Sequence, residues 1–145
     1  MADTFDPLDS EHARPRGVDD DTVEAVGVLS EAFEATEDAR GHLYAFHRLT
    51  GRADSILDRS VALLRRTGND DLADLVEQEL IGRNVLPGRW TFQIVEEYDD
   101  DYYTTFKDIE RTIRERLLAG RRHVFEAEMK ARRRTSGHPS HTAEP

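Results

Sequence analysis

Polar residues on apolar helix faces are the first candidates for chemistry in this sequence, because burying an unpaired charge costs several kcal/mol. Four such residues come from three predicted helices: Arg40, His47, Glu79 and Asp99. If the helices bring them together, they form either a structural cluster of Arg–carboxylate and His–carboxylate pairs or a small ligand-binding site. Tyr102 is available as a hydrogen-bonding neighbour in that site. The sequence leaves the choice between the two open.

Two kinds of ligand would suit the interior site. His47, Glu79 and Asp99 offer the nitrogen and oxygen donors that hold a divalent metal. Arg40 and His47 offer positive charge for a small anionic ligand. The metal alternative extends to a metal-dependent hydrolase, with His47 as a ligand or general base. No feature of the sequence requires a cofactor.

One further His/Glu pair has a spacing related to a metal motif. Helical bundles with a di-metal site use Glu-x-x-His, whereas His123 and Glu126 occur in the reverse order. We place this pair on the solvent side of its helix, as an (i, i+3) pair.

Residue types alone exclude several kinds of catalytic site. The chain has no cysteine, which excludes disulfides, thiolate metal sites and a cysteine nucleophile. It contains no Gly-rich phosphate loop before a helix and no Gly-x-Ser-x-Gly motif. We therefore favour a protein without catalysis of its own.

The stretch RWTFQIVEEYDDDYYTTF, residues 89–106, decides the fold class. A strand would place Asp99 and Asp101 on the same face as Val95. A helix instead gathers apolar residues at steps of three and four along one stripe. The members of this stripe are Val95, Tyr98, Tyr102, Phe106, Ile109, Ile113 and Leu117. The stretch therefore begins a long helix whose solvent side carries most of the carboxylates.

Three helices are predicted before this one. The first covers residues 21–51 and ends at a glycine that can adopt a left-handed cap. The second covers residues 54–67, and the third begins near Asp70 and ends before the Pro87–Gly88 turn. The apolar face of the first helix consists of Ala25, Leu29, Ala32, Phe33, Ala39, Leu43 and Phe46.

The last helix is predicted to start near residue 91, with two alternatives for its end. The apolar stripe keeps its phase beyond Gly120, so one helix could run to residue 133; a break at Gly120 is the alternative, since a helical glycine costs about 1 kcal/mol. A continuous helix would leave apolar residues without cover beyond its partner. These residues are Leu117, Leu118, Val124, Phe125 and Met129. A second subunit would cover them, so we expect a homodimer through the long C-terminal helix.

Together these elements predict an all-α protein. The expected architecture is an antiparallel helical bundle with a long helix, a short two-helix hairpin and a long C-terminal helix. We expect residues 20–134 to form a single domain. Residues 1–19, a mobile acidic tail, and residues 135–145, a mobile C-terminal tail, are polar and aperiodic.

Charge is distributed unevenly along the chain. The net charge of the 145 residues is −10, yet basic residues outnumber acidic ones by nine to three in residues 111–134. Nucleic-acid binding through this basic helix end is a weaker functional alternative, which an isoelectric point near 5.0 disfavours. No apolar run approaches the ~20 residues of a membrane span, so we expect a cytoplasmic protein with no membrane contact. Association with itself or with a partner protein is the leading functional hypothesis.

Overall fold

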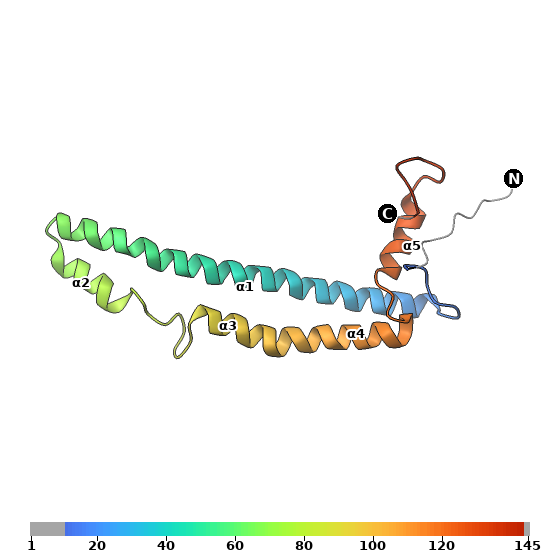
Figure 1. The fold of residues 1–145 in the computed structure, drawn as a ribbon, viewed down its shortest axis with the longest axis horizontal. Coiled ribbons are helices and arrows are strands. Elements are labelled where there is room, and N and C mark those ends of the chain that lie inside the picture. The colour runs from blue at the N-terminus through green and yellow to red at the C-terminus, as the bar shows by residue number, and fades with distance from the viewer. Residues whose placement is uncertain (1–10, 144–145) are drawn as a thin grey trace. The chain divides into compact units, whose positions relative to one another are not determined.

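Helices are the regular elements of the part of the chain that the computed structural model describes, residues 11–143 (Figure 1). The all-α prediction is thereby confirmed. The elements are α1 (Asp20–Arg66), α2 (Asp70–Glu79), α3 (Thr91–Tyr98), the π-helix η1 (Asp99–Tyr103), α4 (Thr104–Leu118) and α5 (Val124–Arg133). The elements α3, η1 and α4 follow one another without a gap. None of the described helices is long and apolar enough to cross a bilayer.

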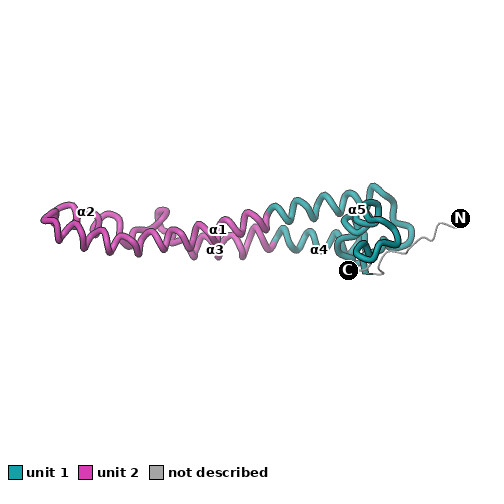
Figure 2. Tube along the Cα trace, turned by 90° about the horizontal axis from the view of Figure 1, so that it is seen from above, with its two compact units in different colours: residues 1–35, 105–145 teal, residues 36–104 magenta. Residues whose placement is uncertain are grey.

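The chain divides into two compact units (Figure 2). Unit 1 consists of the chain up to Ala35 and from Thr105 onward, and unit 2 consists of Thr36–Thr104. In unit 1 the first part of α1 runs antiparallel to α4, and in unit 2 the remainder of α1 runs antiparallel to α3 (Figure 1). A single domain over residues 20–134 stays a prediction.

The first helix does not end at Gly51, which corrects the sequence prediction. α1 continues through this residue to Arg66 and has 47 residues. A glycine costs about 1 kcal/mol inside a helix, and the flanking residues include good helix formers that outweigh this cost. The first half of the predicted two-helix hairpin is therefore the end of α1, and its second half is α2.

The apolar residues of α1 lie on two sides of the helix. Val23, Val26 and Val61 are buried, so the inner side passes through these positions. Of the seven residues of the predicted apolar face, three are half-buried and four are exposed. The exposed ones are Ala25, Ala32, Ala39 and Phe46. A helical wheel combines two neighbouring apolar stripes into one broad face, which explains the error.

The chain turns sharply at two predicted positions. After α1, Gly68 has a φ of 79°, a left-handed conformation that glycine adopts without steric cost. Between α2 and α3, Pro87 and Gly88 form a turn in which the amide of Arg89 donates to the carbonyl of Leu86 at 2.9 Å. The φ of 71° at Gly88 is typical of the third position of a type II turn.

The π-helix η1 shifts the phase of the inward stripe by one residue. A π-helical turn holds one residue more than an α-helical turn. Val95, before η1, is buried as predicted, but Tyr102 and Ile109 are 55% and 51% exposed. Their neighbours Tyr103 and Glu110 are half-buried and buried instead. The wheel assumes a constant rotation per residue and therefore misses this shift.

α4 ends at Leu118 because the chain reverses at the next two residues. Ala119 and Gly120 have positive φ values of 51° and 75°, and the amide of Gly120 donates to the carbonyl of Arg114 at 3.1 Å. This bond closes the helix C-terminus. The break at Gly120 is therefore the correct alternative, and a continuous helix to residue 133 is wrong.

The break lets α5 pack on its own chain within unit 1. Leu118 and Val124 form a core with Val23 and Val26 of α1. Two of the residues that were expected to need a second subunit are thus covered by the chain itself. A homodimer stays a prediction, but the long C-terminal helix no longer supplies the reason for it.

Close packing of α5 on α1 depends on Gly27. A Cβ at this position would lie 2.8 Å from the Cβ and Cγ of Phe125. Such a distance is shorter than van der Waals contact, so only glycine lets the Phe125 ring approach α1 this closely.

Both predicted tails extend into the described part of the chain. Arg14 donates to the Glu128 carboxylate at 2.8 and 3.1 Å, and Arg121 donates to the carbonyl of Ala13 at 2.6 Å. Residues 1–10 and 144–145 lie outside the described residues. The mobility of residues 1–19 and 135–145 stays a prediction.

Candidate functional site

Arg40 of α1 and Asp99 of η1 form a bidentate ion pair in unit 2. Arg40 Nε donates to Asp99 Oδ1 at 2.7 Å, and Arg40 Nη2 donates to Oδ2 at 3.1 Å. The Tyr44 hydroxyl also donates to Oδ2, at 3.2 Å. The side chains of Arg40 and Asp99 are 33% and 23% exposed, so water screens the pair only in part.

Aromatic rings enclose the guanidinium of Arg40. Its Cζ lies 5.0 Å from the ring centroid of Tyr44 and 4.8 Å from that of Tyr103. Both distances are within the range of cation–π attraction. The Tyr103 hydroxyl donates to Glu37 Oε1 at 2.7 Å, which ties η1 to α1 a second time.

The ion pair and its hydrogen bonds shift the acidity of two groups. The guanidinium of Arg40 lowers the pKa of Asp99, and the Tyr44 bond acts in the same direction while partial burial opposes both. The hydrogen bond to Glu37 raises the pKa of Tyr103. Asp99 is therefore a stabilised carboxylate that already accepts three hydrogen bonds, so it is poorly placed to act as a proton carrier or metal ligand.

The π-helix brings Tyr103, rather than Tyr102, beside Arg40. The Thr104 hydroxyl donates to the carbonyl of Asp99 at 2.6 Å and so satisfies a backbone group at the widened turn. Because η1 inserts one residue after Asp99, Tyr103 also lies next to Arg40, whereas Tyr102 is exposed.

The other predicted site residues do not join this cluster. His47 Nδ1 lies 2.7 Å from Thr91 Oγ1, at the N-terminal end of α3, whereas Asp99 follows its C-terminal end. Glu79 is exposed at the end of α2, and the ring of Tyr102 lies tilted against that of Tyr98 with centroids 5.7 Å apart. The prediction thus finds the Arg40–Asp99 pair, but not a shared site with the remaining three residues.

A different group of possible metal ligands lies in unit 1. Within residues 11–143, the only set of three or more carboxylate and histidine side chains with ligand atoms close enough for one ion is Glu34, His123 and Glu126. These atoms lie within 4.8 Å of one another. The predicted set of His47, Glu79 and Asp99 is not such a group. The (i, i+3) pair of His123 and Glu126 faces Glu34 rather than only solvent.

A pocket of about 670 Å³ opens in unit 2 between α1 and the segment that joins α2 to α3. Leu57 and Leu80 contribute apolar surface to it, and Trp90 lies at its edge. The Trp90 indole NH donates to Asn84 Oδ1 at 2.6 Å, and the ring contacts Phe92 edge to face. Asp54 and Arg83 are the charged residues of its lining, and most of the remaining surface is apolar.

Sequence reasoning missed a buried ion pair in unit 1. Arg114 Nε donates to Glu110 Oε1 at 3.0 Å, and both side chains are only 10% exposed. Ser30 of α1 donates to the same oxygen, and Arg114 also donates to the carbonyl of Gly120. The (i, i+4) spacing of Glu110 and Arg114 was the available signal, but the phase shift at η1 hid that both face inward.

Comparisons with models of protein families, with curated proteins and with solved structures find no match to this chain.

Proposed function

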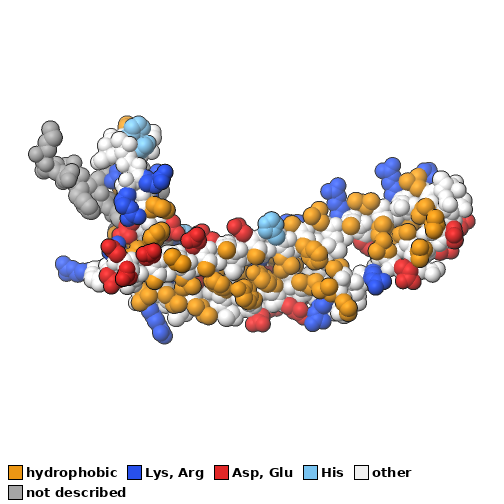
Figure 3. Space-filling model, turned by 180° about the vertical axis from the view of Figure 1, so that it is seen from behind, with side chains coloured by type: hydrophobic (Ala, Val, Ile, Leu, Met, Phe, Trp, Pro, Cys, Tyr) orange, Lys and Arg blue, Asp and Glu red, His pale blue; other side chains and the backbone are white. Residues whose placement is uncertain are grey.

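We propose that this protein acts by association through apolar helix faces, with itself or with a partner protein, and has no catalysis of its own. The supporting observation is the number of large apolar side chains at its surface. Fifteen such residues in the described chain are at least 40% exposed, whereas seven hydrophobic residues are buried. Figure 3 shows many apolar side chains close together on the face turned to the viewer. Scattered apolar residues are normal on a protein surface, but contiguous faces indicate an interaction site.

An interior site for a metal or anion has less support. Asp99 is held by Arg40 and Tyr44, and Glu79 points to solvent. A ligand at this site would have to break the ion pair before binding. Catalysis would also need a free acid or base beside the substrate.

Nucleic-acid binding through the basic helix end also has less support. Arg114 is buried against Glu110, and Arg111 pairs with Asp108 at 2.9 Å. Arg121 donates to a backbone carbonyl. These contacts reduce the positive charge available to phosphates.

The test is sedimentation velocity of the full chain over about 1–100 µM, a range that detects micromolar association. A mass above 16.6 kDa that grows with concentration would support self-association. A monomer at every concentration would contradict it. Native mass spectrometry of the same sample would report a retained metal or small molecule, and such a mass would favour the interior-site alternative.

A further inference from the structure

α1 carries a second apolar stripe, separate from the side that packs on its own chain. Its members follow one another at steps of four and three without exception, which is the heptad spacing of a coiled coil. All of them are exposed. This stripe, which we call the outer seam, consists of Ala25, Val28, Ala32, Ala35, Ala39, His42, Phe46, Leu49, Ala53, Ile56, Ser60 and Leu63.

The outer seam is unusual for a surface that faces only water. Ten of its twelve residues are apolar, and the helix supplies them over five consecutive heptads. Leu49 and Ile56 are 60% and 57% exposed. Inner residues such as Val61 lie on another side of α1, and the described part of the chain leaves the outer seam exposed, although Ala53 also lines the pocket of unit 2. Sustained heptads of this kind specify a helical partner.

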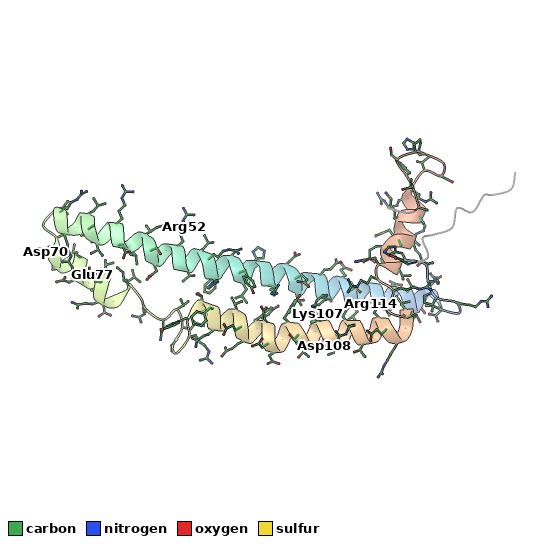
Figure 4. All side chains as sticks on the ribbon, in the orientation of Figure 1. Arg52, Asp70, Glu77, Lys107, Asp108 and Arg114 are labelled. Carbon is green, nitrogen blue, oxygen red and sulfur yellow. The ribbon has the colours of Figure 1, made fainter. Side chains whose placement is uncertain are left out.

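Charged residues flank the outer seam in an ordered way. A row of residues at steps of seven runs beside the outer seam, each directly before a seam residue except the last, which continues the row beyond the end of the seam. Its members are Glu24, Glu31, Asp38, Ala45, Arg52, Arg59 and Arg66. This row is acidic in the first half of α1 and basic in the second. Its six charged members are exposed, and none of them forms an ion pair with another residue of the described chain. Figure 4 shows Arg52 projecting from the side of α1 opposite α3.

This row of charges fits a second copy of α1 as the partner, with the two helices antiparallel. In an antiparallel pair of helices, residues at this heptad position face the same position of the partner, so the acidic half of one row meets the basic half of the other. The three acidic residues and the three basic residues of the row lie at equal distances in sequence on either side of Ala45, so each acidic residue has a basic counterpart. Glu24 meets the partner's Arg66, Glu31 meets the partner's Arg59, and Asp38 meets the partner's Arg52.

Side-chain size supports the same direction. The first half of the outer seam is mainly alanine, and the second half holds most of its large residues. Antiparallel pairing in this register places Ala25 against the partner's Leu63, Ala32 against the partner's Ile56, and Ala39 against the partner's Leu49. In these three layers large residues face small ones, which is how core layers fill space evenly. In the same register Ala35 meets the partner's Ala53, and His42 meets the partner's Phe46.

A parallel pair of α1 helices would lose both the match of opposite charges and the match of large with small side chains. It would stack alanine on alanine in one half and large residues on each other in the other half. The acidic residues would face the partner's Leu29, Thr36 and Leu43, which are uncharged. The charges therefore select the antiparallel direction, while the apolar seam supplies the attraction.

We propose that two copies of this chain associate through the outer seams of their α1 helices, which lie antiparallel with Ala45 near the twofold axis. This inference rests on the proposed function and specifies its partner and surface. It uses only α1, which is one continuous helix from Asp20 to Arg66.

Cysteine cross-linking tests the register directly, because the natural chain has no cysteine. Ala35 and Ala53 face each other across the proposed seam, and both are exposed. We would prepare A35C and A53C separately, one with a size tag, and oxidise each alone and both together. The expected result is a strong cross-link in the mixture and little in either protein alone.

The other outcomes separate failure of the seam from failure of association. Efficient cross-linking of A35C with itself would show parallel helices and overturn the inference. A dimer by sedimentation without the mixed cross-link would overturn the seam but leave the proposed function standing. A monomer at all concentrations would overturn both the seam and self-association, and would leave a partner protein as the remaining form of the proposed function.

Charge reversal gives an independent test. The triple variant R52E/R59E/R66E would have an all-acidic row, and E24R/E31R/D38R an all-basic one. Each is expected to lose at least tenfold in self-association, and their mixture to form a heterodimer. Arg116→Glu, an exposed reversal on α4, is the matched control and should leave the dimer unchanged. Undiminished self-association of both triple variants, with helix content preserved by circular dichroism, would refute the antiparallel seam.

Discussion

At the scale of single residues, Asp99 and Arg40 form the contact between helices that is easiest to test. The carboxylate accepts hydrogen bonds from two guanidinium nitrogens and from Tyr44. The guanidinium also lies between the rings of Tyr44 and Tyr103. Charge-assisted bonds of this kind are stronger than neutral ones, and the η1 turn is anchored to α1 through them.

We predict that Asp99→Asn lowers the free energy of unfolding by about 1–2 kcal/mol, because a neutral amide keeps the shape but weakens the bonds to Arg40. Urea unfolding at pH 7 measures the change. Asp108→Asn is the control. Its partner Arg111 is an exposed (i, i+3) neighbour, and such pairs contribute at most about 0.5 kcal/mol. Equal losses in the two variants would contradict a special role for Asp99.

The lowered pKa of Asp99 also predicts how this contribution depends on pH. Arg40 is the main cause of the lowering, and an unfolded chain has an ordinary Asp pKa of about 3.9. The contribution is therefore fully present above about pH 5 and disappears as the pH falls through the lower pKa of the folded state. The stability difference between the natural protein and Asp99→Asn should stay constant from pH 7 to 5 and close below about pH 4. A difference that does not narrow at all as the pH falls below 4 would exclude the charged pair as its origin.

Helical periodicity predicts the Arg40–Asp99 pair because it places both polar residues on the apolar faces by which their helices pack together. It fails for Glu79 because α2 is short and its last turn is exposed. It also fails for Glu110, since the extra residue in η1 rotates every later side chain. Single-residue assignments therefore hold only up to the first irregular turn.

At the scale of elements, Gly27 and Gly41 make a matched pair within α1. An alanine Cβ at Gly27 would collide with Phe125, whereas nothing lies within 4 Å of the same position at Gly41. We predict that Gly27→Ala destabilises the protein by about 1–2 kcal/mol, because overpacking outweighs the gain in helix propensity. Gly41→Ala should stabilise it by about 0.5–1 kcal/mol. Urea unfolding of both variants gives the signs, and stabilisation in both would show that α5 does not depend on the contact.

Periodicity predicts most helix positions but not all helix ends. The start of α2 near Asp70 and the turn at Pro87 follow from turn chemistry and are present. The expected end at Gly51 is wrong, because one glycine is a weak signal inside a helix-forming sequence. The end at Gly120 is real because Ala119 also takes a left-handed conformation and α5 then buries Val124. The burial of Val124 is a tertiary contact, which the local sequence around Gly120 does not reveal.

At the scale of the whole molecule, dimerisation predicts a melting temperature that depends on concentration. Binding between folded chains stabilises them by mass action, and a hundredfold increase above the dissociation constant adds up to about 2.7 kcal/mol. Raising the protein from about 1 to 100 µM should therefore raise the melting temperature by several degrees. Differential scanning fluorimetry or circular dichroism measures it. The all-acidic triple variant should show no such rise, and a constant melting temperature in the natural protein would argue for a monomer.

The position of Trp90 gives the molecule a built-in optical probe. It is the chain's single tryptophan and lies in unit 2, 55% exposed, at the edge of the pocket. Its fluorescence therefore reports on one unit, whereas far-ultraviolet circular dichroism reports on helices in both. Recorded on the same denatured samples, coincident curves mean that the two units unfold in one cooperative step, and separated curves mean that each has a stability of its own.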